Sequence, residues 1–94
     1  MTSPQTSGFD HHWGTPSNIH FPEGDSYFNY GKNIDGSVIQ NTTYATTDTV
    51  DDAIALVNQA SGPWFMYLAF NSAHAPWHAP PSELHSYDLP PNAN

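Results

Sequence analysis

Residues 62–76 read Gly-Pro-Trp-Phe-Met-Tyr-Leu-Ala-Phe-Asn-Ser-Ala-His-Ala-Pro, and this stretch decides the fold that the sequence predicts. Residues 64–70 are all apolar or aromatic and carry no charge. A continuous apolar run of this length, opened by Gly-Pro, is typical of a strand buried on both faces of a parallel sheet. The sequence therefore predicts a strand over residues 64–70, with alternate side chains on opposite faces.

The residues before this run predict a helix over residues 49–60. Apolar side chains recur there at the three-four spacing of one helix face, at Val50, Ala53, Ile54, Val57 and Ala60. Asp51 and Asp52 fall on the opposite side of the helix. Gly62 is expected to end the helix. Helix, tight turn and buried strand are half of a βαβ unit, which predicts an α/β fold.

The rest of the chain adds little to that unit. Nine prolines and six glycines are spread over the 94 residues, and the first half is loop-rich. Short strands are predicted over residues 27–30 and 37–40, with a turn at residues 31–33. A parallel strand buried on both faces needs neighbouring strands and a second helical layer. We therefore expect residues 1–94 to be an internal fragment of a larger α/β domain.

Charge and composition exclude several classes of function. The sequence has nine Asp and Glu residues, one lysine (Lys32) and no arginine, which gives a formal net charge of −8. Binding to nucleic acid or to an anionic membrane surface needs clustered Lys and Arg, so neither partner is expected. The chain has no cysteine, which excludes a thiol nucleophile and a thiolate metal site within it.

Among six histidines, His74 has the most suggestive position. It follows the predicted strand, where α/β folds bind their ligands, although an ordinary loop histidine has the same sequence pattern. His74 and His78 have the i,i+4 spacing of helical zinc sites, but Pro76 between them disfavours a helix. The sequence therefore predicts no metal held by this chain alone.

Five segments carry a resemblance: Gly-Phe-Asp at 8–10, Tyr-Ala-Thr-Thr-Asp at 44–48, Asp-Ala-Ile at 52–54, Pro-Trp-Phe-Met-Tyr-Leu at 63–68 and Asn-Ser-Ala-His-Ala-Pro at 71–76. In type and order they resemble the sulfatase family over residues 8–81. That family reads Tyr-x-Thr-Asp, then Asp/Glu-x-Ala-Ile, then Pro-Phe-Phe-Leu-Tyr and Pro-His-x-Pro, after an upstream Gly-Phe-Asp segment. Ala73 departs from the pattern, because the family usually has proline there.

The resemblance implies an alkaline-phosphatase-like α/β fold that hydrolyses sulfate esters of a small molecule or carbohydrate. It also implies a formylglycine nucleophile, made from Cys or Ser in a Cys/Ser-x-Pro-x-Arg motif, and a calcium ion held by aspartates. This chain has no arginine to complete the nucleophile motif, and its segments do not match the family's calcium ligands. We therefore expect the parent enzyme to supply both from other segments, and the isolated chain to be inactive.

Two residues carry over from the family's site. His74 matches the histidine that contacts the sulfate group and assists departure of the alcohol, so it is the candidate catalytic and substrate-binding residue. Asn18 aligns with a polar residue that contacts sulfate in some sulfatases, with Ser17 as a neighbouring possibility and a plain turn as the alternative. His78 and His85 lie at unmatched positions, where we expect small effects of substitution.

Two other readings stay open at this stage. One is a phosphate- or phosphonate-ester hydrolase of the same superfamily. The other is a binding or structural module without catalytic activity.

Overall fold

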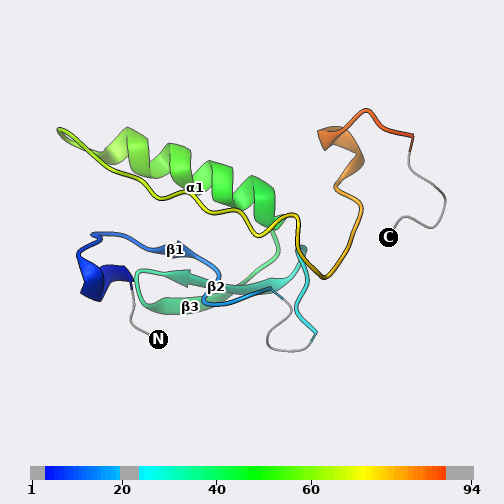
Figure 1. Cartoon of the computed structure of the whole chain (residues 1–94), viewed down its shortest axis with the longest axis horizontal. Helices are drawn as coiled ribbons and strands as arrows, with labels where there is room; N and C mark the ends of the chain where they lie inside the picture. The colour runs from blue at the N-terminus through cyan, green and yellow to red at the C-terminus, as the bar shows by residue number, and fades with distance from the viewer. Residues whose placement is uncertain (1–3, 20–23, 89–94) are drawn as a thin grey trace.

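The computed structural model describes residues 4–19 and 24–88, and in this part of the chain one α-helix lies over a three-stranded antiparallel sheet (Figure 1). The sheet has the order β1-β2-β3. Two 3-10 turns, η1 and η2, flank these elements. In chain order the elements are η1 Pro4–Ser7, β1 Trp13–Gly14, β2 Tyr30–Ile34, β3 Ser37–Asn41, α1 Ala45–Gln59 and η2 Ser82–Leu84.

A two-residue turn joins β2 to β3. Ile34 pairs with Ser37, which leaves Asp35 and Gly36 as the loop, with φ angles of 51° and 101°. Positive φ at both positions is the geometry of the type I′ hairpin, for which Asp-Gly is a preferred sequence. The predicted strand over 37–40 is confirmed within β3. The predicted turn at 31–33 is wrong, because the Asp-Gly pair sets the turn and β2 runs through those residues.

The Asp35 carboxylate fastens the N-terminal segment to this hairpin. Its Oδ2 accepts hydrogen bonds from His11 Nδ1 at 3.0 Å and Trp13 Nε1 at 3.1 Å, and its Oδ1 accepts one from the His12 backbone N–H at 2.9 Å. Burial raises the pKa of the Asp35 carboxyl, but these bonds outweigh that effect and hold its pKa below the usual value. β1 is thereby fixed at the end of β2.

The helix is confirmed over residues 49–59, but α1 starts earlier, at Ala45. The Ala45 backbone N–H donates to the Tyr27 carbonyl at 2.9 Å, so the chain ahead of β2 satisfies a donor at the start of the helix. The predicted apolar face is wrong in part, because Val50 is 41% and Ile54 55% exposed. The side of α1 that faces the sheet instead carries acidic residues.

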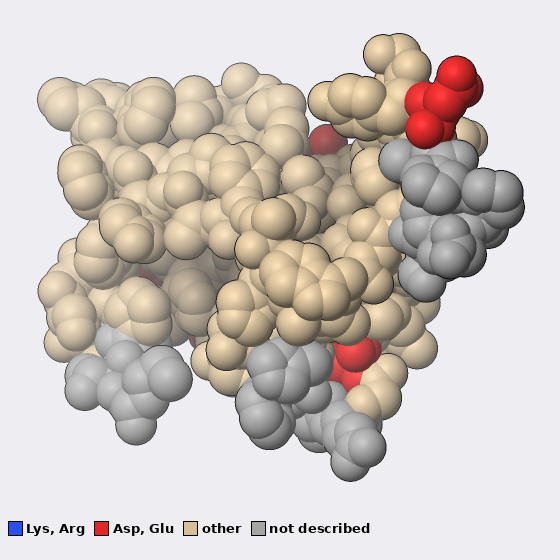
Figure 2. Space-filling model, turned by 45° about the vertical axis from the view of Figure 1, so that its right-hand side comes forward, with Lys and Arg blue, Asp and Glu red and all other residues tan. Residues whose placement is uncertain are grey.

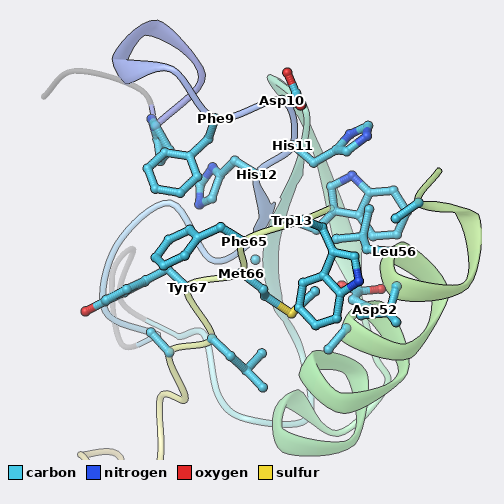
Figure 3. A pocket seen from close by; sticks show the side chains of 18 of the residues that line it. Phe9, Asp10, His11, His12, Trp13, Asp52, Leu56, Phe65, Met66 and Tyr67 are labelled. Carbon is cyan, nitrogen blue, oxygen red and sulfur yellow. The ribbon is translucent and has the colours of Figure 1, made fainter. Parts of the chain in front are cut away.

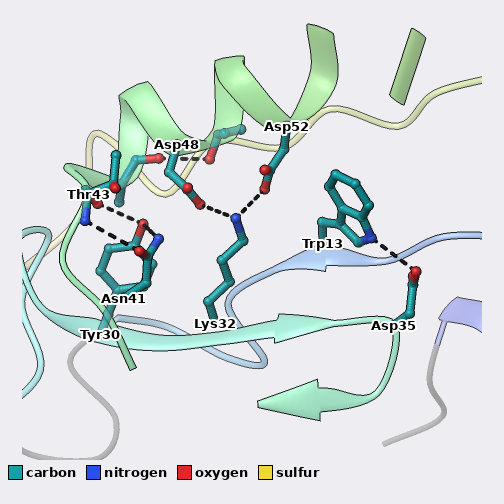
Figure 4. A network of polar contacts seen from close by, with 10 residues as sticks. Trp13, Tyr30, Lys32, Asp35, Asn41, Thr43, Asp48 and Asp52 are labelled. Carbon is teal, nitrogen blue, oxygen red and sulfur yellow. Dashed lines mark hydrogen bonds and ion pairs between the residues drawn. The ribbon is translucent and has the colours of Figure 1, made fainter. Parts of the chain in front are cut away.

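Those acidic residues bind Lys32 of β2 (Figure 4). Lys32 Nζ lies 2.7 Å from Oδ2 of Asp48 and 2.7 Å from Oδ2 of Asp52, which share a helix face at i,i+4 spacing. Burial lowers the pKa of Lys32, but the two carboxylates outweigh it and raise that pKa above its usual value. Burial, together with repulsion from Asp48, raises the pKa of Asp52 despite Lys32. Asp52, which the helical spacing puts opposite the predicted apolar face, therefore faces the sheet.

Lys32 is the one Lys or Arg in the sequence, and it is only 5% exposed. The face drawn in Figure 2 shows separate acidic side chains and no basic one. The charged side chains at the surface are therefore almost all negative, while the one lysine is buried.

The predicted α/β arrangement with a buried parallel strand is wrong. Residues 63–71 run back along α1 as extended chain, and no ladder partner for them occurs among residues 4–19 and 24–88 (Figure 1). Phe65 is 77% and Tyr67 78% exposed, and Met66 is half-buried. A strand needs neighbours to pair its backbone N–H and C=O groups, and the strands in this part of the chain pair only with each other, antiparallel.

The buried core is small and lies between the start of α1 and the sheet. Its members come from three separate stretches of the chain, and the half-buried Tyr44 packs against them. They are Ile19, Tyr27, Tyr30 and Ala45. In the described ranges, no helix has both the length and the apolar character needed to cross a membrane.

Candidate functional site

The extended run ends in a loop, residues 71–78, that carries His74 at the N-terminal end of α1. The Tyr27 hydroxyl lies 2.9 Å from the Asn71 carbonyl and 2.8 Å from the His74 carbonyl. On the helix side, Thr46 Oγ1 lies 3.2 Å from Ser72 Oγ. The loop is therefore held by the core and by the first turn of α1, rather than by a sheet.

The His74 side chain is exposed, and its ring has a defined tautomer. Its Nδ1 lies 3.0 Å from the Ala75 carbonyl, which can only accept, so Nδ1 carries a hydrogen. In the neutral ring Nε2 is then the basic nitrogen, and protonation turns it into a charged donor. An imidazole in this state can bind an anionic oxygen or give a proton to a leaving oxygen.

The segment that carries Asn18 is joined to the His74 loop through neighbouring residues. Asn71 Nδ2 donates to Thr15 Oγ1 at 3.0 Å, which links the chain after β1 to the start of the loop. Asn18 itself is exposed, and its carbonyl accepts a long 3.5 Å bond from Ser17 Oγ. The structure thus brings the two predicted segments together but describes no contact between Asn18 and His74.

Several aromatic rings pack around the C-terminal end of the loop. The His78 ring packs against the Tyr27 ring, tilted by 30° with ring centroids 4.1 Å apart, and lies edge-to-face with the Phe28 ring at a centroid distance of 5.6 Å. Tyr44 Oη lies 2.9 Å from His78 Nε2. No sequence pattern indicates these contacts, because 51 positions separate Tyr27 from His78 and neither belongs to a periodic element there.

One hollow in the described part of the chain lies apart from His74 and Asn18, neither of which lines it. It has a volume of about 1130 Å³ and is enclosed by the N-terminal segment, α1 and residues 63–71 (Figure 3). Trp13, Leu56 and Met66 form part of its wall. Its lining includes residues 63–71 but no residue of the His74 loop beyond Asn71.

The residues described in this chain do not fit a resident metal ion. Within residues 4–19 and 24–88, no three His, Cys, Asp or Glu side chains lie close enough together to hold one. Calcium takes six to eight oxygen ligands, and the paired carboxylates of Asp48 and Asp52 are already bound to Lys32. A calcium ion would therefore need ligands from elsewhere.

One comparison with known proteins gives a match. The family model described as Sulfatase matches residues 1–88, a span that includes both β1 and the His74 loop. Neither a curated protein nor a solved structure matches the chain.

Proposed function

Because the chain belongs to the sulfatase family, we propose that it forms part of a catalytic domain that hydrolyses sulfate esters. The observation that carries this proposal is the family match across residues 1–88, which covers the His74 loop. The substrate class we assign is a sulfated small molecule or carbohydrate. We expect no nucleic-acid partner, because such binding needs clustered Lys and Arg and the sequence has one lysine and no arginine.

The role we assign to His74 is contact with the sulfate group and proton donation to the leaving alcohol. With Nδ1 held by the Ala75 carbonyl, Nε2 of the protonated ring is the atom that would donate. When the ester S–O bond breaks, the alcohol oxygen develops negative charge, and a proton from Nε2 neutralises it. We assign Asn18 a secondary role as a polar contact to the sulfate.

The nucleophile in this proposal comes from outside the sequence. The family's formylglycine motif ends in arginine, and this chain contains none. A calcium ion, with ligands likewise from other segments, belongs to the proposal only as part of the complete domain. We therefore expect this chain alone not to turn over sulfate esters, since loss of such groups costs several orders of magnitude in rate.

The test is His74→Ala in a catalytically competent protein that contains residues 1–88 of this chain. We expect kcat/KM for an aryl sulfate to fall by about 10²–10⁴-fold, the range for a general acid. The loss should shrink for esters with good leaving groups, because their alcohols need less protonation. His85→Ala is the matched control and should change kcat/KM by less than about threefold.

Three outcomes would contradict the proposal. Equal, mild losses at His74 and His85 would remove the catalytic assignment. Faster turnover of the matching aryl phosphate than of the sulfate would favour a phosphate-ester hydrolase of the same superfamily. Tight binding of a sulfated ligand without turnover, in the complete protein, would favour a binding module.

A further inference from the structure

The Tyr27 hydroxyl bonds to both ends of the loop segment that finishes at His74. Tyr27 is 1% exposed, and its hydroxyl reaches the carbonyls of both Asn71 and His74, at 2.9 and 2.8 Å. Carbonyl oxygens only accept, so the single phenolic hydrogen is shared between them. One buried side chain therefore sets the distance between the two ends of residues 71–74.

The ring of Tyr27 also contacts the C-terminal end of the loop. The His78 ring packs against it at a tilt of 30°, and His78 Nδ1 donates to the Pro76 carbonyl at 3.1 Å. In the neutral His78 ring Nε2 then accepts from Tyr44 Oη. The backbone is thus held directly at His74 by Tyr27 and two residues later by His78.

The hydroxyl of Tyr27 keeps its hydrogen over the whole neutral range. Burial raises the pKa of the phenol, and this effect is larger than the lowering by its bond to the His74 carbonyl. The two carbonyls therefore face a donor at every pH at which a histidine acid would work.

We propose that Tyr27 is a positioning residue for His74, which fixes the backbone that aims the imidazole at the ester. This inference rests on the proposed function of His74. Catalysis is sensitive to placement, since a displacement of about 1 Å can cost about 10²-fold in rate. His78 helps to hold the same loop, a role that its unmatched sequence position does not indicate.

The first experiment uses the 94-residue chain and Tyr27→Phe, which keeps the ring and removes the hydroxyl. ¹⁵N relaxation should show the backbone order parameters of residues 72–75 falling from about 0.85 toward 0.6. Tyr67→Phe is the matched control, because Tyr67 is 78% exposed, and it should leave those values unchanged. Unchanged order parameters in a folded Tyr27→Phe chain would overturn the proposal.

A second variant covers the case in which Tyr27→Phe does not fold. His78→Phe retains a stacking ring but loses the bond to the Pro76 carbonyl. It should raise the mobility of residues 74–77 while the amide shifts of α1 stay dispersed. A folded His78→Phe chain with a loop as rigid as that of the parent would contradict the role of His78 in holding the loop.

The second experiment measures Tyr27→Phe in the catalytically competent protein. We expect kcat to fall about 10- to 100-fold with KM within about threefold. A purely structural role would lower the fraction of folded enzyme and leave kcat per folded molecule unchanged. Normal kcat in Tyr27→Phe, beside a large loss in His74→Ala, would refute the positioning role alone. A silent His74→Ala would refute the proposed function, whatever Tyr27→Phe does to the loop.

Discussion

The hairpin–helix unit (residues 27–59) and the apolar run (residues 63–71) are built in opposite ways. The hairpin–helix unit has few long apolar stretches, yet it contains Tyr27, Tyr30 and Lys32, each exposed by 5% or less. The apolar run is the most hydrophobic stretch of the sequence, yet Tyr67 in it is 78% exposed. Burial here follows the presence of a matching partner rather than the hydrophobicity of a segment.

The partners in the hairpin–helix unit are specific polar groups. Lys32 is buried because two carboxylates bind its ammonium group. Tyr30 is buried because its hydroxyl donates to the Thr43 carbonyl at 2.9 Å. Burial, with repulsion from Asp48, raises the pKa of Tyr30 well above its usual value, so that hydroxyl remains a donor. The apolar run has no ladder partner within the described residues, and its backbone stays extended without a sheet.

The largest effect on this contrast is expected from Lys32→Met. Removing the cation leaves Asp48 and Asp52 facing each other across a partly buried space, and breaking a buried ion pair in this way costs about 3–5 kcal/mol. Loss of helical circular dichroism at lower urea concentration measures it. Asp52→Asn is the control, because Asp48 still neutralises Lys32 and the raised pKa of Asp52 shows that its charge is held at a cost. A milder effect for Lys32→Met than for Asp52→Asn would contradict this account.

A smaller effect is expected at Asp35. Asp35→Asn keeps a residue that tolerates positive φ but removes the charge from three hydrogen bonds, which should cost about 1–2 kcal/mol at pH 7. The pKa of Asp35 is lowered in the folded chain, so its contribution is present above the ordinary pKa of about 3.9 and is lost as the pH falls through the lowered value. Urea unfolding at pH 7 and near pH 2 should show the difference between the two chains shrinking in acid. A difference that grows in acid would contradict the assignment.

The smallest effect is expected in the apolar run. Tyr67→Ser should change the free energy of unfolding by less than about 0.5 kcal/mol, because the side chain is already in water. It should also reduce aggregation, since exposed apolar surface promotes association. Thermal melts with light scattering measure both. A destabilisation of 2 kcal/mol or more would show that Tyr67 is covered in solution, and would remove the contrast between the two regions.

The sequence predicted the features that depend on local physics. Residues 49–59 are helical because their apolar spacing and helix formers favour one conformation, and β3 contains the predicted strand over 37–40. The motifs around His74 predict membership of the sulfatase family, and the family match confirms it. The roles of His74 and Asn18 in catalysis stay predictions.

Only the tertiary structure decided what each element packs against. A continuous apolar run indicates burial in general, but whether residues 64–70 form a strand depends on a neighbour that no periodicity in this chain specifies. The helix face toward the sheet was set by Lys32 on β2, so Asp52 points inward although the helical spacing puts it opposite the predicted apolar face. Tyr27 and His74 lie 47 positions apart, and their contact exists only because the start of α1 brings the core under the loop.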